Sequence, residues 1–223
     1  MCGRLTQQLS SSEIADLFGA EDLAHDDGRH YNVAPTQPVR VVVEHDQRRA
    51  VTAFRWGLIP PWAQSASVGA KLINARAETV AEKPAFKNAF RRHRCLIPAD
   101  AFYEWKVEPG RKTPYAVRRT DERPMAFAGI WSSWREPSNS ERVISFAIVT
   151  TSANHTLSAI HERMPVILPD DAWNYWLDPN AEDLGALQSL LIPAPDDSVL
   201  AYPISTLVNS VRNDGPELLA RAS

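Results

Sequence analysis

The chain has 223 residues, of which 44% are hydrophobic and 23% are charged, and its formal net charge is -3. A chain of this length can bury a substantial core as one large domain. Because it contains neither a long apolar span nor a secretory signal segment, the sequence predicts a cytoplasmic protein without membrane contact. The slightly acidic balance argues against a protein that coats nucleic acid through bulk positive charge.

The first third of the chain contains patterns for a helix and a hairpin. Ser10 and Glu13 have the spacing of a capping box, which predicts a short helix that ends at Phe18. Two β-branched runs, at residues 39–43 and 51–56, are separated by a polar stretch and predict a β-hairpin.

The remaining patterns predict further strands and helices. Apolar runs between turn residues predict strands at residues 115–118, 125–131 and 143–151. Proline entry or a polar cap, with Asn154 as one N-cap, predicts helices at residues 84–94, 155–162 and 171–177. Many strands, few helices and 17 prolines, without regular βαβ alternation, indicate an α+β fold with a mixed or antiparallel sheet. We expect one domain over residues 1–223.

The cysteine at the second position, Cys2, is a candidate nucleophile. Because a small residue follows Met1, we expect Met1 to be removed, which leaves an amine and a thiol on one residue. Reference pKa values of about 7.7–8.0 and about 8.5 leave a useful fraction of both groups unprotonated near neutrality. Such a pair can capture an aldehyde as a five-membered thiazolidine. An ordinary cysteine near a frayed terminus is the alternative, and Cys95 is predicted to be a buried core thiol.

Several polar residues lie in segments where packing would not select them. Asn74 and Arg76 follow an apolar pair, and alternation along an extended segment would point both to one side. Glu104 lies between two aromatic residues, which predicts a desolvated carboxyl able to carry a proton. His161 and Arg163 are also two residues apart. Each alone is more typical of a structural residue, but together they supply an amide, a carboxyl, an imidazole and two guanidiniums.

Other patterns are less informative. The basic clusters at residues 91–94, 111–112 and 118–119 are each more typical of a solvated face than of a phosphate site. The two cysteines form no metal-spaced pair, and the spacing of His155 and His161 does not match ligation from one helix face. The sequence therefore predicts no metal and no cofactor.

Ordered motifs along nearly the whole chain resemble the SOS-response-associated peptidase (SRAP) domain family. The matching segments are MCGR at 1–4, YNVAP at 31–35, RWGLIP at 55–60, INARAET at 73–79, RCLIP at 94–98, FYEW at 102–105 and HERMPVIL at 161–168, with a further match at Val208, Asn209 and Asn213. The resemblance implies a single SRAP-type domain with a barrel-like β-sheet core and flanking short helices.

The resemblance also implies an activity and a site. The expected partner is single-stranded DNA that contains abasic sites, including single-strand/double-strand junctions, and the expected product is a covalent thiazolidine crosslink formed during the DNA damage response. The residues implied for chemistry are Cys2 as nucleophile, Asn74 to orient it, Glu104 to shuttle protons and His161 to assist sugar opening. The residues implied for DNA binding are Arg4, Arg76 and Arg163 at phosphates and Trp62 or Trp56 at bases. Core packing is the alternative for both tryptophans.

Two other functions remain open at this point. A thiol peptidase, acting on other chains or on its own N-terminus, would use Cys2 with His161 and either Glu104 or Asn74. In a noncovalent single-stranded DNA-binding or interaction module, Cys2 would be incidental and a blocked N-terminus would change nothing. Cleavage of the abasic strand by β-elimination is a possible additional activity. We further expect a monomer from a bacterial cytoplasm that associates with the nucleoid when bound to DNA.

Overall fold

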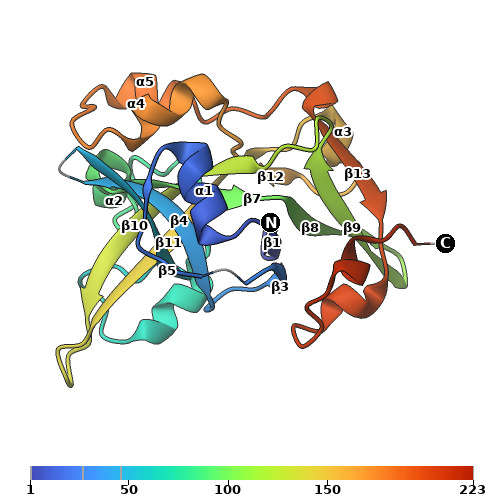
Figure 1. Cartoon of the computed structure of the whole chain (residues 1–223), viewed down its shortest axis with the longest axis horizontal. Helices are drawn as coiled ribbons and strands as arrows, with labels where there is room; N and C mark the ends of the chain where they lie inside the picture. The colour runs from blue at the N-terminus through green and yellow to red at the C-terminus, as the bar shows by residue number, and fades with distance from the viewer. Residues whose placement is uncertain (1, 27, 46, 223) are drawn as a thin grey trace.

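The computed structural model describes residues 2–26, 28–45 and 47–222 and is built on two β-sheets (Figure 1). The first sheet has the strand order β13 (Val199–Pro203), β9 (Arg111–Arg119), β8 (Ala101–Glu108), β1 (Leu5–Gln7) and β3 (His30–Val33). The second has the order β12 (Arg163–Pro165), β11 (Arg142–Ser152), β10 (Met125–Arg135), β7 (Arg94–Ala99), β4 (Pro38–His45), β5 (Arg48–Trp56) and β2 (Glu21–Asp22), and β6 (Asn74–Arg76) pairs with β11.

Short helices flank these sheets. The α-helices are α1 (Ser11–Phe18), α2 (Lys87–Arg92), α3 (His155–Ser158), α4 (Trp173–Leu177) and α5 (Leu184–Ser189). The 3-10 helices are η1 (Ala66–Lys71), η2 (Asp170–Ala172), η3 (Asp196–Ser198), η4 (Thr206–Asn209) and η5 (Pro216–Leu219). No helix within the described ranges has the length and apolarity that crossing a bilayer would require.

A parallel pairing closes the second sheet into a barrel. β11 pairs with β10 in antiparallel fashion and with β5 in parallel fashion, where Phe146 lies opposite Trp56. The circuit β5, β4, β7, β10 and β11 is therefore complete, and none of these five strands is left as an open edge. The observed α+β barrel confirms the predicted fold class.

The pleat of the barrel strands separates two hydrophobic cores. In β4, Val41 packs in one buried cluster and the adjacent Val42 packs in the other, as expected for a strand with apolar groups on both faces. The inner cluster joins the barrel to Cys2 and to Leu5 of β1, whereas the outer cluster packs under helices α1, α2 and α4.

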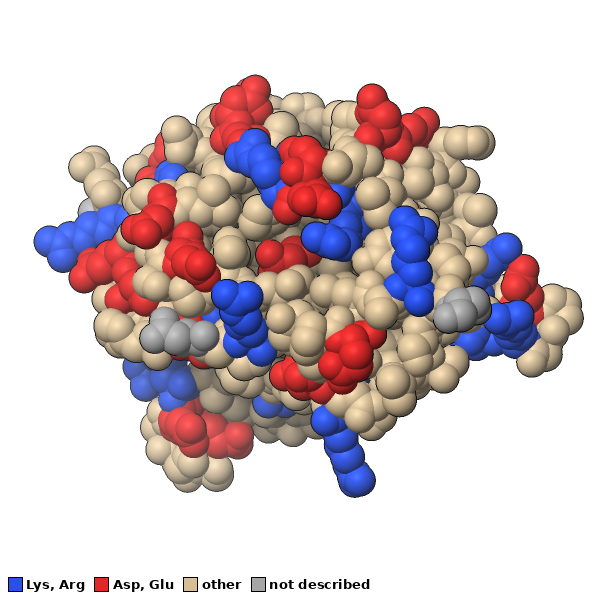
Figure 2. Space-filling view, turned by 45° about the vertical axis from the view of Figure 1, so that its right-hand side comes forward, with Lys and Arg blue, Asp and Glu red and all other residues tan. Residues whose placement is uncertain are grey.

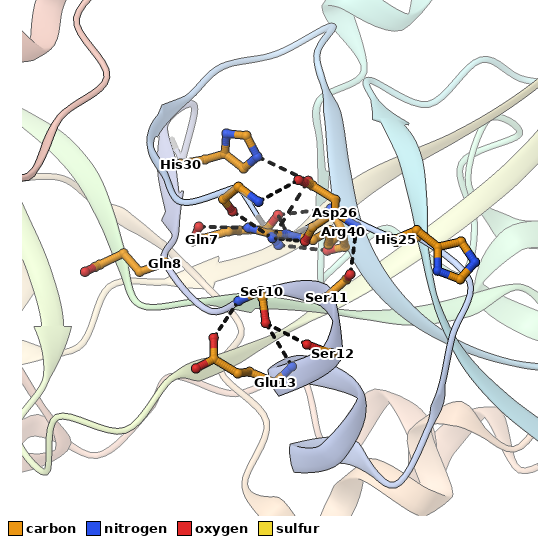
Figure 3. Close-up of polar contacts among 12 residues, drawn as sticks. Gln7, Gln8, Ser10, Ser11, Ser12, Glu13, His25, Asp26, His30 and Arg40 are labelled. Atoms are coloured by element: carbon orange, nitrogen blue, oxygen red, sulfur yellow. Dashed lines mark hydrogen bonds and ion pairs between the residues drawn. The ribbon is translucent and has the colours of Figure 1, made fainter.

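Buried Arg40 ties the N-terminal strand to the barrel (Figure 3). Its Nη2 donates to the carbonyl of Gln7 at 2.8 Å, and its Nη1 donates to the carbonyls of Asp26 and Gly28 at 2.9 Å. The Gln7 amide in turn donates to the carbonyls of Arg40 and Pro98 at 2.8 Å. Because the side chains of Arg40 and Gln7 are buried, these bonds avoid the cost of unsatisfied polar groups. The network fixes the strand that begins three residues after Cys2.

The predicted elements agree with the structure in type more often than in length. The capping box at Ser10 and Glu13 is present, and the hairpin is β4 and β5. The predicted helix over residues 84–94 is limited to α2, because Arg94 begins β7 and its buried guanidinium donates to the carbonyls of Phe90, Arg91, Trp176 and Asp178. The predicted helix over residues 155–162 is limited to α3 because the chain turns toward β12.

Candidate functional site

Cys2 is buried in the candidate site and is not part of a frayed end. Its relative exposure is 0%, and its carbonyl oxygen accepts a hydrogen bond from Asn74 Nδ2 at 2.8 Å. β6 positions Asn74 because it pairs with β11 in parallel, with Asn74 opposite Ile148. Asn74 Oδ1 is buried and has no hydrogen-bond partner among the described residues. The expected removal of Met1 concerns a residue outside the described ranges.

The Cys2 thiol is strongly protected against ionisation. Burial, followed by the negative charge of Glu104, raises its pKa to about 12, although a hydrogen bond from the Arg4 backbone opposes the shift. The expectation that a useful fraction of the thiol is ionised near neutrality is therefore wrong for this structure, because it used the pKa of a solvated thiol. The sulfur needs a base at the moment it reacts.

Glu104 and His161 form the polar wall beside this thiol. Glu104 is buried on β8, and its Oε1 lies 3.9 Å from His161 Nε2. His161 Nδ1 accepts a hydrogen bond from the Arg163 backbone N–H at 2.9 Å. In the neutral ring this interaction places the proton on Nε2, which is the nitrogen that faces the carboxyl group. The four residues expected to carry the chemistry thus form one connected cluster.

Arg4 borders the cluster but is partly engaged. Its Nη1 donates to Asn32 Oδ1 at 2.6 Å and to the carbonyl of Val208 at 2.7 Å, and its guanidinium carbon lies 5.8 Å from the Trp105 ring centroid. It lines a hollow of about 470 Å³ with Lys112, Asn209 and its neighbour Gly3.

Sequence reasoning missed three residues around Arg4. Trp105 and Lys112 line its hollow, and the Lys112 ammonium lies 5.4 Å from the Trp105 ring centroid. Buried Asn32 holds the guanidinium and also donates to the carbonyls of Ser210 and Asn213. A signal was available for two of them, because Trp105 directly follows Glu104 and Asn32 lies in one of the matching motifs.

Arg163 and Arg76 differ in how accessible they are. The Arg163 guanidinium binds Glu78 through two contacts of 2.6 and 2.9 Å and also donates to the carbonyl of Thr150. This pairing lowers the pKa of Glu78, whose side chain is 52% exposed while that of Arg163 is 12% exposed. Arg76 is exposed and lines a hollow of about 590 Å³ together with Asn74. Of these two, only Arg76 presents an open guanidinium.

The two tryptophans have different roles in the structure. Trp62 is 61% exposed and lines the same hollow as Asn74 and Arg76. Trp56 is 0% exposed, stacks on Phe146 and donates from Nε1 to the carbonyl of Ile73 at 3.0 Å. The expectation that Trp56 offers a face to DNA bases is therefore wrong, because both faces are packed inside the barrel. Trp56 instead holds the residue that directly precedes Asn74.

The charge on the face seen in Figure 2 is mixed. Figure 2 shows acidic and basic side chains interspersed on one face of the molecule, without a continuous patch of either sign. Within the described ranges there is no group of three or more His, Cys, Asp or Glu residues that could hold a metal ion. The arrangement offers a buried thiol, two proton carriers, Glu104 and His161, whose facing atoms lie 3.9 Å apart, and arginines at the rim.

Comparison with known proteins shows the family of this chain. Residues 1–211 match the family model described as SOS response associated peptidase (SRAP). The chain belongs to this family. The abasic site processing protein YoqW of Bacillus subtilis (strain 168) is 41% identical over 222 residues, which cover 98% of this chain and 99% of the relative.

Two further comparisons support the family assignment. The abasic site processing protein YedK of Escherichia coli (strain K12) is 32% identical over 230 residues, covering 98% of this SRAP chain and 99% of the relative. A crystal structure of a protein from Bacteroides thetaiotaomicron superposes with a TM-score of 0.90 at 28% identity, and the match covers 100% of both chains.

Proposed function

We propose that this SRAP chain processes abasic sites in DNA by capturing the exposed aldehyde on Cys2. The observation that carries the proposal is the buried cluster in which Asn74 holds the Cys2 carbonyl while Glu104 and His161 line the space beside the thiol. Relatives that match nearly the full chain are named abasic site processing proteins.

The protonation state of the thiol sets the order of the chemistry. A thiol with a pKa of about 12 is almost entirely protonated at neutral pH, so the free amine of Cys2, exposed by removal of Met1, attacks the aldehyde carbon first. The resulting carbinolamine loses water and leaves a carbon–nitrogen double bond. The thiol then gives its proton to Glu104 while sulfur adds to the same carbon, and Glu104 passes this proton on to the nitrogen. One aldehyde and one aminothiol become one thiazolidine and one water.

Glu104 and His161 also provide what sugar opening requires. An abasic deoxyribose is mostly a closed hemiacetal, so a proton must leave its hydroxyl while another reaches the ring oxygen. His161 Nε2–H is a donor and the Glu104 carboxylate is an acceptor, and the two atoms lie 3.9 Å apart. His161 is the more exposed of the pair, and we place it on the side from which the sugar enters.

The arginines at the rim would hold the DNA backbone without reading its sequence. In this proposal Arg4, Arg76 and Arg163 contact phosphates near the lesion, and Trp62 stacks on a neighbouring base. Arg163 exchanges the Glu78 carboxylate for a phosphate when DNA enters, since both anions need the same donors. We propose single-stranded DNA and single-strand/double-strand junctions as substrates, bound by a monomer that associates with the nucleoid.

Intact-mass spectrometry of the purified protein with and without an abasic oligonucleotide tests this function. We expect loss of Met1 and an adduct that retains the DNA minus one water. Cys2→Ala should abolish the stable adduct and retain noncovalent DNA binding. Cys95→Ala, the matched substitution of the other buried thiol, should still form the adduct. Undiminished adduct with Cys2→Ala would contradict the proposal.

The same samples distinguish the remaining activities. A shortened DNA product without retained protein would indicate β-elimination of the abasic strand. Cleavage of a peptide that depends on Cys2, without any DNA adduct, would instead favour a thiol peptidase. Binding that is unaffected by a blocked N-terminus would favour a noncovalent DNA-binding module.

A further inference from the structure

The basic segment around α2 has no role in the chemistry described above. Residues 83–99 contain five Lys or Arg residues and no acidic residue, in a chain whose net charge is -3. Arg94 is buried and serves the fold through its four carbonyl contacts, but Lys83, Lys87, Arg91 and Arg92 are exposed. None of these four forms an ion pair with a described residue. Exposed cations without counter-charges are the electrostatic requirement for binding a polyanion.

A series of hollows connects this segment to the candidate site. The hollow of about 590 Å³ that contains Asn74 and Arg76 also contains Lys83 and Trp62. A second hollow of about 460 Å³ shares Trp62 and two other residues with the first. Because Trp62 forms part of both, its exposed indole stands between the two hollows. The first hollow adjoins the candidate site, because Asn74, which lines this hollow, also donates to the Cys2 carbonyl.

The series continues around α2. The second hollow is lined by Asn88 of α2 and by His93, Ser132 and Ser133. A third hollow of about 250 Å³ is lined by Arg91 and Arg92 together with Pro179, Asn180, Ala181, Glu182 and Leu184. Residues three and four positions apart lie on the same side of a helix, so Asn88 and these two arginines share one side of α2. Figure 1 shows α2 beneath α4 and α5, at the end of the molecule away from the C-terminus.

We propose that these three hollows bind the strand of single-stranded DNA that flanks the captured nucleotide on one side, with Arg91 and Arg92 at its phosphates. This inference rests on the proposed function, because it takes the nucleotide at Cys2 as the start of the strand. Trp62 separates two spaces and presents a flat apolar surface to the base that lies between them. The polar groups of Asn88, Ser132 and Ser133 continue the track with hydrogen-bonding partners rather than with charge. The basic cluster at residues 91–94 is therefore divided: Arg94 is structural, and Arg91 and Arg92 bind DNA.

Equilibrium binding of an undamaged single-stranded oligonucleotide, measured by fluorescence anisotropy over a range of salt concentrations, tests the track. Each phosphate contact on a single strand contributes about 0.7 to the slope of log affinity against log salt, so the double variant Arg91→Ala/Arg92→Ala should lower the slope by about 1.4. Lys87→Ala is the matched control, because Lys87 is an exposed cation of the same helix that lines none of the three hollows. An unchanged slope in the double variant, or an equal decrease per charge in Lys87→Ala, would overturn the proposal.

A length series locates the track relative to the lesion. Abasic oligonucleotides are lengthened one nucleotide at a time on either side, and affinity is measured for the wild-type protein and the double variant. The double variant should lose the gain from lengthening one flank and keep the gain from the other. Loss on both flanks, or on neither, would contradict the assignment. Because undamaged DNA forms no adduct, the salt experiment remains informative even if mass spectrometry finds no capture by Cys2.

Discussion

Replacing Glu104 with glutamine is expected to change two properties of Cys2 in opposite directions. Glu104 is the second cause, after burial, of the raised pKa of the Cys2 thiol. A pKa of about 12 in place of 9.0 makes the thiolate fraction at neutral pH about a thousandfold smaller than for a solvated thiol. Glu104→Gln removes the charge and leaves the burial, so it recovers part of this factor. Alkylation of Cys2 by iodoacetamide should therefore become faster, because the thiolate is the reactive form.

Crosslink formation should respond in the other direction. If Glu104 accepts the proton from the thiol and passes it to the nitrogen, its amide replacement cannot do either. Proton transfer by a positioned side chain is worth about 10²- to 10⁴-fold, so we expect single-turnover crosslinking to slow within that range while DNA affinity changes little. Faster alkylation of Cys2 together with slower crosslinking in Glu104→Gln would separate the charge effect of Glu104 from its catalytic role.

Cys95 provides the internal control for this experiment. Its pKa is raised by burial without a contribution from Glu104, so Glu104→Gln should leave its alkylation rate unchanged. Mass spectrometry of the digested protein reports both cysteines from one sample. Faster crosslinking in the variant would remove Glu104 from the proton transfers. Slower alkylation of Cys2 would refute the argument that the carboxylate acts on the thiol through its charge.

Two further predictions concern stability. Gly69→Ala should lower the free energy of unfolding in urea by about 1–3 kcal/mol, because the new Cβ would lie 2.5 Å from the Gly57 carbonyl oxygen and the backbone would have to move; an unchanged value would show that η1 and the end of β5 are not held in close contact. Burial raises the pKa of Cys2 and Cys95, so both stay protonated in the folded state while unfolded thiols ionise above about 9. Stability should therefore be fully retained below pH 9 and fall above it, and Cys95→Ala should make the fall shallower; a steeper fall in Cys95→Ala would contradict the assignment.

The sequence predicts those elements that are stabilised by contacts between residues close together in the chain. The capping box of Ser10 and Glu13 satisfies backbone groups within one turn, so its spacing alone predicts α1. The hairpin of β4 and β5 follows for the same reason. By contrast, β7 was missed because all six of its residues are buried, so its pattern lacks the alternation of a strand with one solvated face.

Pairings between distant residues were not readable in this way. Nothing near Arg163 in the sequence indicates that Glu78, 85 residues away, occupies its guanidinium. The burial of Cys2 has the same origin, because it depends on β8 and on barrel residues that are distant from Cys2 in the sequence. The motif resemblance brought these residues together as a set, but it did not show which of them are accessible. That distinction separates Trp62 from Trp56.

β11 explains why closing the barrel also assembles the site. Its first half pairs in parallel with β5 and completes the barrel, and its second half pairs in parallel with β6, which places Asn74 opposite Ile148 and Arg76 opposite Thr150. On its other edge β11 pairs with β12, which places Arg163 opposite Ser152 and thereby fixes the turn that carries His161. A shift of one residue along β11 would reverse the faces of these side chains. The apolar residues that set the register of β11 in the barrel therefore also set which polar groups meet at Cys2.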